Sequence, residues 1–210
     1  MAADGNTILP QSLKSEVIDE TSFYLADAER PVGLNETWGL RLRSKLRARK
    51  QHVKQFEFGL TVTGRGKLFV DGKLVIDNWT KQRQGDTFFG SGTLEEKGII
   101  DVTQDHSPEI LVEFSNVSGP RDGDLGEQLL PPGVRFGGGD ILDEDETMQM
   151  AVDCAKAADV AVVVVGLNGD WESEGYDRTT LALPARTDEL IEKIVTANPR
   201  TVVVTQAVGV

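Results

Sequence analysis

Hydrophobic and polar residues alternate along much of the first half of the chain. In residues 55–63, single polar or small residues separate four hydrophobic ones: Phe56, Phe58, Leu60 and Val62. This period of two predicts a half-buried strand. Shorter hydrophobic runs at 68–70, 74–76, 99–102 and 110–114 predict further strands, and the dipeptide at 71–72, Asp-Gly, is typical of a hairpin turn. Several short strands joined by Gly and Asp turns favour an antiparallel β-sandwich or barrel.

The last third of the chain has a different periodicity. Hydrophobic residues at 148, 151, 152 and 155 share one helical face, as do those at 190, 191, 194 and 195. β-branched runs at 160–165 and 201–205 follow these helices, and we expect the first of these strands to be buried on both faces. Strand, helix and strand in this order imply a parallel, right-handed crossover. A two-stranded parallel sheet is not stable by itself, so we expect this part to be incomplete.

A stretch rich in Gly, Pro and Asp, residues 118–139, separates the two patterns. Its composition predicts a linker or a long surface loop. The predicted fold class is therefore β + α/β. An antiparallel β domain occupies residues 1–120, a linker residues 121–142, and a truncated α/β domain with parallel strands residues 143–210.

The composition disfavours several classes of protein for this chain, among them nucleic-acid-binding and disulfide-rich proteins. The 210 residues include 22 Lys+Arg and 34 Asp+Glu, a formal net charge of −12, which disfavours nucleic acid and anionic membranes as partners. We interpret the basic stretch at 41–54 as a solvated edge strand. The one cysteine, Cys154, excludes an internal disulfide and a cysteine-rich zinc site, and we expect it to be at least half-buried in a helix. The N-terminus shows no signal-peptide pattern, so location stays unassigned, as does the oligomeric state.

The strongest candidate for chemistry is the loop after the strand at 160–165. It combines carboxylates, aromatic rings and an arginine: Asp170, Trp171, Glu172, Glu174, Tyr176, Asp177 and Arg178. Ligands of open α/β sheets bind beyond the carboxyl ends of strands. Carboxylates and a Trp face suit a sugar, and a carboxylic acid can protonate a glycosidic oxygen. A solvated acidic surface is the alternative. A nucleotide site is disfavoured, because the glycines do not fit G-x-G-x-x-G and carboxylates repel phosphate.

At this loop the sequence resembles a known family. The segments VVGLNGDWESEGYDR, LALP, DELI and TVVV are similar to the C-terminal α/β sandwich domain of family 3 glycoside hydrolases, especially the fungal β-glucosidases. Upstream, ETWGLRLRSKL, FEFGLTVTGRGKLFVDGKLVIDNWTKQ, FFGSGTLEEKG and ILVEFSNV resemble the PA14 domain inserted in that subgroup. The resemblance covers residues 22–208. It implies a parent β-glucosidase that removes terminal non-reducing β-D-glucosyl residues with retention, from β-glucosides or cello-oligosaccharides. A non-catalytic carbohydrate-binding or interaction protein is the alternative.

The resemblance also implies roles within the loop. The family's acid/base glutamate falls on Glu174, with Glu172 as the alternative. Asp177 and Arg178 are expected to brace the loop, and Trp171 to pack near the sugar or in a core. Glu172 and Glu174 alone do not make a retaining pair, because alternate residues of an extended segment point the same way. In the family the nucleophile is an aspartate of the N-terminal TIM-barrel domain, so we expect the isolated 210-residue chain to be inactive.

The resemblance places the PA14 insert over the active-site pocket. Phe88 and Phe89 lie in a loop with flanking glycine, and we expect them to reach the pocket and bind substrate; burial in the sandwich core is the alternative. The chain lacks the adjacent Asp-Asp pair that PA14 lectins use for calcium, so we expect neither metal nor cofactor. Sequons at Asn35, Asn78 and Asn116 permit glycosylation if the protein is secreted, as many relatives are.

Overall fold

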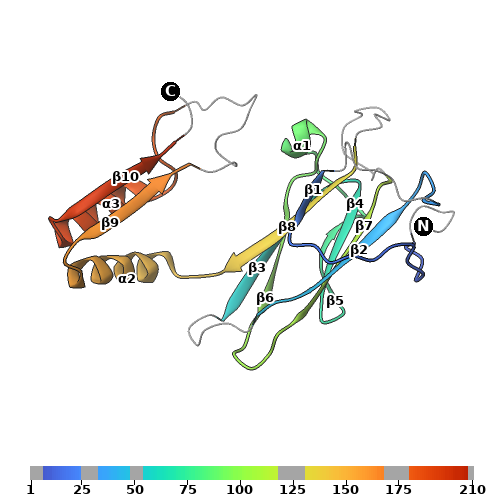
Figure 1. Cartoon of the computed structure of the whole chain (residues 1–210), viewed down its shortest axis with the longest axis horizontal. Helices are drawn as coiled ribbons and strands as arrows, with labels where there is room; N and C mark the ends of the chain where they lie inside the picture. Colours follow the sequence, from blue (N-terminus) through green and yellow to red (C-terminus); the bar gives the residue numbers. More distant parts are fainter. Residues whose placement is uncertain (1–6, 25–32, 48–53, 118–130, 168–179, 208–210) are drawn as a thin grey trace. The chain divides into compact units, whose positions relative to one another are not determined.

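The computed structural model of the chain describes residues 7–24, 33–47, 54–117, 131–167 and 180–207 (Figure 1). It divides into two compact units, Met1–Ile141 and Leu142–Val210. The first contains antiparallel sheets and the second a small parallel sheet with helices, which confirms the predicted mixture of β and α/β structure. No helix in the described ranges is long and apolar enough to cross a membrane.

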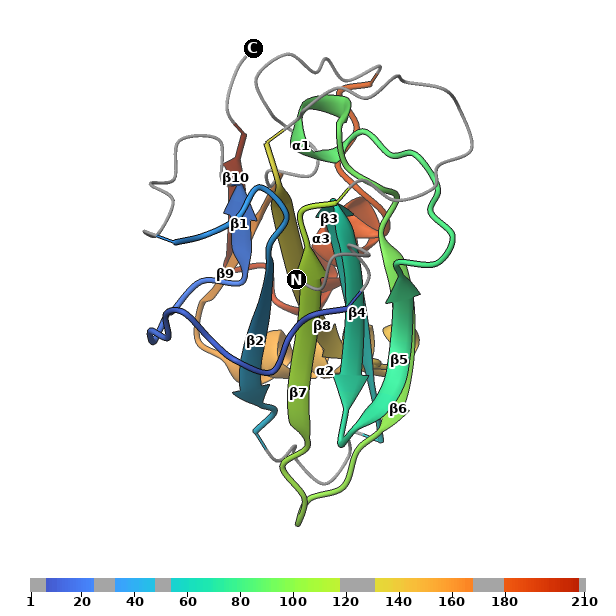
Figure 2. The same cartoon turned by 90° about the vertical axis from the view of Figure 1, so that its right-hand side faces the viewer.

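The described residues of the first unit form two four-stranded antiparallel sheets. One has the order β1-β8-β3-β6, formed by Ser22–Tyr24, Gly133–Asp140, Gln55–Thr63 and Glu96–Asp101. The other has the order β2-β7-β4-β5 and faces the viewer in Figure 2; its strands are Gly39–Lys45, Glu109–Ser115, Arg65–Val70 and Lys73–Asn78. The strands predicted from the period of two are thereby confirmed.

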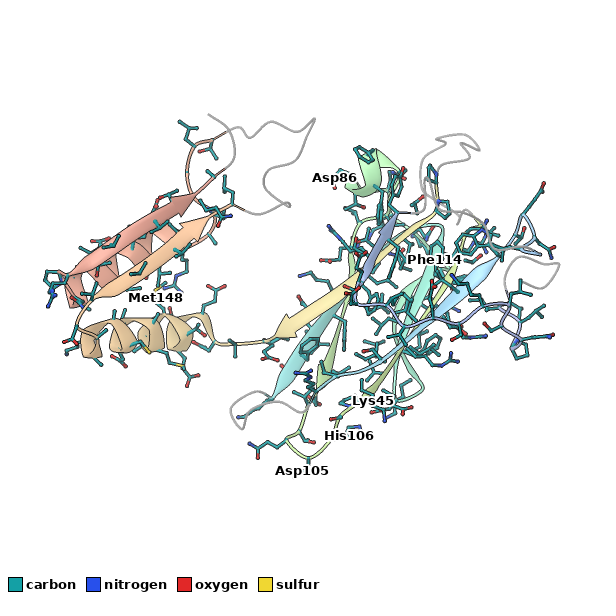
Figure 3. All side chains as sticks on the ribbon, viewed as in Figure 1. Lys45, Asp86, Asp105, His106, Phe114 and Met148 are labelled. Atoms are coloured by element: carbon teal, nitrogen blue, oxygen red, sulfur yellow. The ribbon has the colours of Figure 1, made fainter. Side chains whose placement is uncertain are left out.

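Hydrophobic residues from both sheets form the core of the first unit. The four hydrophobic residues of β3 are buried as expected, but the strand is not half-buried along its whole length, because Thr61 and Thr63 on its other face are buried too. The hydrophobic residues of β3 join buried residues of β4, β7 and β8 in one core: Phe56, Phe58, Leu60, Val62, Leu68, Val112, Phe114 and Val134. Phe114 is fully buried and lies inside this unit in Figure 3. Burying each such side chain contributes about 1.5–3 kcal/mol to folding.

The linker predicted at 121–142 is wrong for residues 133–140. These residues are strand β8, which pairs with β1 on one side and β3 on the other. Val134 and Phe136 point into the core, but the glycines that follow hide the strand pattern in the sequence. One of them has a packing reason, because a Cβ on Gly138 would collide with the carbonyl oxygen of Glu57 and the ring of Phe56.

The basic stretch begins as an edge strand, as expected. β2 lies at the edge of its sheet and pairs only with β7 among the described strands. Two of its cations face carboxylates on β7: Arg41 Nε is 2.8 Å from Glu113 Oε1, and Lys45 Nζ is 3.3 Å from Glu109 Oε1. Charged side chains on an edge strand disfavour pairing with another sheet edge.

The second unit follows the predicted order of helix, strand, helix and strand. The elements are α2 (Glu144–Ala157), β9 (Ala161–Gly166), α3 (Thr187–Ala197) and β10 (Thr201–Gln206). β9 and β10 are parallel. Asp143 caps α2 by accepting a hydrogen bond from Glu146 N at 2.8 Å. Residues of the two helices and β9 share one core: Ala155, Ala161, Val163, Val165 and Ile194.

Two sequence-based expectations for the second unit are wrong. β9 is not buried on both faces, since Val162 and Val164 are each 64% exposed while Val163 and Val165 are buried. The buried valines pack with the helices on one face of the sheet only. Cys154 is exposed rather than half-buried, because it falls beside the stripe of α2 that faces the core.

Candidate functional site

The carboxyl ends of β9 and β10 meet at one edge of the parallel sheet. Gly166 and Gln206 end the two strands side by side, and Leu167 N donates to Gln206 O at 3.0 Å just beyond them. Gly166 has a φ of 157°, and a Cβ there would collide with the carbonyl oxygen of Gln206. Only glycine therefore fits where the chain leaves β9 for the predicted acidic loop.

The residues predicted to carry the chemistry lie outside the described residues. This applies to the whole set in the 168–179 segment: Trp171, Glu172, Glu174, Asp177 and Arg178. The described residues on either side of that segment are Leu167, next to β9, and Thr180, which precedes α3. The segment thus connects the carboxyl end of a parallel strand to the next helix, the usual position of a ligand-binding loop in open α/β sheets.

An ion-pair cluster fixes the start of α3. The Arg186 guanidinium binds Glu189 through two hydrogen bonds, at 2.7 and 2.8 Å, and Nη1 lies 2.7 Å from Asp145 Oδ1 in α2. Hydrogen bonds from Arg186 and then Lys193 lower the pKa of the Glu189 carboxyl to about 2, and the same contacts with Glu189 and Asp145 raise the pKa of Arg186. The cluster joins the two helices and supports the helix that follows the candidate loop.

A second candidate lies on the first unit, in the short helical turn α1 (Thr87–Gly90). Phe88 and Phe89 both have left-handed backbone angles, with φ of 52° and 56°. Each costs on the order of 1–2 kcal/mol for a residue with a Cβ. Hydrogen bonds within the loop hold this conformation: Gly85 N to Gly92 O at 2.9 Å, and Gln84 Nε2 to Gly90 O at 2.6 Å.

Three aromatic rings gather at this turn. The ring of Tyr24, in β1, stacks on Phe88 with a centroid distance of 5.4 Å and lies 5.9 Å from Phe89. Phe89 is 88% exposed and Phe88 is half-buried. Neither phenylalanine belongs to the buried core, so core packing does not explain them. We call Tyr24, Phe88 and Phe89 the aromatic cluster.

Tyr24 is the member of the aromatic cluster that the sequence did not suggest. It lies in a strand of three residues, too short for a period of two to be recognised. The sequence indicates the aromatic cluster only through Phe88 and Phe89, which are adjacent and precede a glycine. The ring contact arises because β1 pairs with β8, and β8 begins at Gly133, against which the Phe88 ring packs.

His106 and Asp71 form an exposed pair on the first unit, away from the aromatic cluster. His106, labelled in Figure 3, has its Nε2 2.7 Å from Asp71 Oδ2. The hydrogen bond from His106, with a second from Glu109 N, lowers the pKa of Asp71. Within the described ranges, no three His, Cys, Asp or Glu side chains are placed to hold a metal ion.

Comparison with protein families gives a match over almost the whole chain. Residues 12–210 match the glycosyl hydrolase family 3 C-terminal domain. Among curated relatives, "Probable beta-glucosidase J" of Neosartorya fischeri is 40% identical over 188 residues, covering 89% of this chain and 22% of the relative. "Probable beta-glucosidase I" of Aspergillus clavatus is 41% identical over 154 residues, covering 72% and 18%. The chain thus spans about a fifth of the length of these relatives.

Solved structures agree with the match. A β-glucosidase from Kluyveromyces marxianus in complex with glucose is 33% identical with a TM-score of 0.72, covering 89% of this chain and 21% of that one. The selenomethionine-labelled form of the enzyme gives a TM-score of 0.80 at 29% identity, covering 96% and 23%. From the match at 12–210, the chain belongs to glycosyl hydrolase family 3, within its C-terminal domain.

Proposed function

We propose that the parent protein of this chain is a β-glucosidase that releases terminal non-reducing β-D-glucosyl residues with retention of configuration. The observation that carries this proposal is the similarity to relatives named as β-glucosidases, at 40% identity over 89% of the chain. A similar solved structure is described as a complex with glucose. The substrate class is a β-glucoside or cello-oligosaccharide, and the reaction needs no cofactor.

Glu174 is the acid/base residue of this proposal. As an acid it donates its proton to the glycosidic oxygen while an aspartate of the TIM-barrel domain attacks the anomeric carbon. As a base it then removes a proton from the water that hydrolyses the glucosyl-enzyme. Support comes from the carboxyl edge of the parallel sheet, where β9 ends at Gly166 shortly before this residue. Glu172, two positions earlier, is the alternative.

The other loop residues position the substrate and the acid/base carboxyl. Trp171 packs against the apolar face of the sugar. Asp177 and Arg178 brace the loop by a charge-assisted pair. Arg186, which follows the loop in the sequence, is already bound to Glu189 and Asp145. Its guanidinium therefore links the two helices, and substrate binding is assigned to the loop residues.

We further propose that the first unit is a PA14 domain and that its aromatic cluster binds substrate. Phe88 and Phe89 are the substrate-binding residues, and the Tyr24 ring stacks on Phe88. Two observations favour this role: Phe89 is 88% exposed, and both phenylalanines have left-handed backbone angles. Such strain is concentrated at ligand-binding sites. We place the end of this domain after β8 rather than at residue 120, and the α/β part of the family 3 domain from Leu142 onward.

The test compares Glu174→Gln with Glu172→Gln in the parent protein. For Glu174→Gln we expect kcat on an unactivated glucoside to fall by roughly 10²–10⁴, with a smaller loss on a dinitrophenyl glucoside, whose leaving group needs no proton. Added azide should restore turnover of the glucosyl-enzyme, because an anionic nucleophile needs no general base. Wild-type hydrolysis by Glu174→Gln would remove this residue from the role, and the same pattern in Glu172→Gln would transfer the role to Glu172.

A further inference from the structure

Three sequons of the Asn-X-Ser/Thr type occur in the chain, at Asn35, Asn78 and Asn116. All three belong to the first unit. An N-linked glycan is bulky and hydrophilic, so it fits only an asparagine whose side-chain nitrogen reaches solvent in the folded protein. The surroundings of the three side chains therefore distinguish them.

Asn78 cannot carry a glycan in the folded chain. It is fully buried at the end of β5. Its Nδ2 donates to Leu60 O at 3.0 Å and to Thr93 Oγ1 at 2.8 Å. A sugar on this nitrogen would replace one of these donors and would have to enter a region where Gln82 and Thr93 are also completely buried.

The side chain of Asn116 is engaged with the loop that precedes β2. Its Oδ1 accepts from Trp38 N at 2.8 Å, and its Nδ2 donates to Glu36 O at 2.7 Å. The residue is half-buried. A glycan on this nitrogen would disturb the contact to Glu36 and the position of Trp38, whose ring packs 5.9 Å from that of Phe114 in the core.

Asn35 differs from both. It is exposed and lies in the loop just before Glu36, the residue that Asn116 holds. The hydroxyl residue of its sequon is Thr37, also in this loop. The loop is anchored by its neighbours Glu36 and Trp38 through Asn116, so the asparagine side chain is free to project into solvent.

We propose that Asn35 is an N-glycosylation site and that Asn78 and Asn116 are not modified in the folded chain. The proposal applies to a chain that enters the secretory pathway, where the donor is a lipid-diphosphate-linked oligosaccharide. A bond forms between Asn35 Nδ2 and C1 of the first sugar, and the bond from C1 to the diphosphate oxygen breaks. The amide nitrogen loses one proton, and the lipid diphosphate leaves.

The test secretes the full 210-residue chain from a yeast host by means of an N-terminal leader. The folded, secreted protein is treated with peptide N-glycosidase in H₂¹⁸O, which converts each glycosylated Asn into ¹⁸O-labelled Asp, and the peptides are analysed by mass spectrometry. Asn35→Gln is compared with Thr37→Ser, which keeps the sequon. Thr80→Ala removes the sequon at Asn78 while leaving the buried asparagine in place.

We expect the label at Asn35 alone. Asn35→Gln should lose the glycan completely, whereas Thr37→Ser and Thr80→Ala should retain one glycan each. Folding of each secreted variant is checked by its circular dichroism spectrum. An unlabelled Asn35 in the folded wild-type chain, or a label at Asn78 or Asn116, would overturn the proposal.

Discussion

The side chain of Asn198 joins the ends of both helices of the second unit. It follows the last residue of α3, and its Nδ2 donates to the carbonyl oxygens of Ala155 and Ala158, at the end of α2, at 2.9 Å each. Its Oδ1 accepts from Arg200 N at 2.9 Å. The sequence predicts only that Asn-Pro ends a helix. The contact with α2 is a tertiary one, between residues 43 positions apart along the chain.

We expect Asn198→Ala to lower the free energy of unfolding of the second unit by about 1–3 kcal/mol, because the Ala158 carbonyl oxygen loses the Asn198 donor and the Ala155 carbonyl oxygen keeps only the one from Ala158 N. Asn198→Asp should be worse at pH 7, since a carboxylate would face two carbonyl oxygens. Urea unfolding followed by the helical circular dichroism signal measures both changes. Stability in Asn198→Asp equal to wild type would contradict this account.

The left-handed backbone at Phe89 is unfavourable in free energy. Burial of the side chain does not compensate, because Phe89 is exposed. The Gly-flanked sequence predicts a loop here, but not two left-handed phenylalanines, because the hydrogen bonds that impose these angles form only in the folded loop. We expect Phe89→Gly to be about 1 kcal/mol more stable than Phe89→Ala, since only glycine avoids the Cβ penalty. Thermal unfolding followed by tryptophan fluorescence compares the two. Equal stabilities would show that the turn is not strained at this position.

At the scale of elements, sequence periodicity predicts a strand or helix when one of its faces packs in a core. The strands around Phe56 and Leu68 and the helices around Ala155 and Ile194 have a hydrophobic side that packs in the core of their own unit. The pattern does not predict β8, because three of its residues in a row are glycines and one of them, Gly138, is required by its close contact with Phe56 and Glu57 of β3. No strand period in the sequence reports such a contact.

The link between the starts of α2 and α3 should depend on pH through Glu189. Its pKa falls from the ordinary value of 4.5 to about 2, because Arg186 and Lys193 hydrogen-bond the charged form. A lowered pKa stabilises the folded state above pH 4.5, and this contribution is lost as the pH falls toward 2. The wild-type chain should therefore lose helical signal over this range more steeply than Glu189→Gln.

Circular dichroism at a series of pH values measures that difference, and Glu192→Gln, an exposed position on the same helix, serves as the control. Glu192→Gln should follow the wild-type curve. If Glu189→Gln also followed it, the contact with Arg186 would contribute nothing to helix docking.

At the scale of the whole molecule, the net charge of −12 disfavours nucleic acid and anionic membranes as partners but points to no site. The proposed site residues come from the resemblance at residues 168–178, whereas the family match shows the family. The acidic loop itself belongs to residues that the structure does not describe, so the roles of Glu174 and its neighbours rest on sequence alone. In contrast, the aromatic cluster could not be predicted in full, because Tyr24 and Phe89 meet only after β1 joins its sheet.

The exposed face of the parallel sheet gives a further prediction about the whole chain. Val162 and Val164 of β9 lie beside Val202 and Val204 of β10, and all four are at least 42% exposed. A contiguous apolar surface of this kind promotes binding of hydrophobic dyes and self-association. Replacing all four by threonine, which has the same shape and suits strands, should reduce the fluorescence of bound anilinonaphthalene sulfonate and the apparent mass in sedimentation.

The matched control is Val163→Thr, on the buried face of the same strand. It should leave the exposed surface unchanged but lower stability by about 1–3 kcal/mol, because a hydroxyl enters a core formed by Ala155, Ile194 and their neighbours. Changes on the exposed face of β9 should thus alter dye binding and sedimentation. A change on the buried face should alter the free energy of unfolding. If the four-threonine variant bound the dye as strongly as wild type, the valine face would not be the surface that the dye recognises.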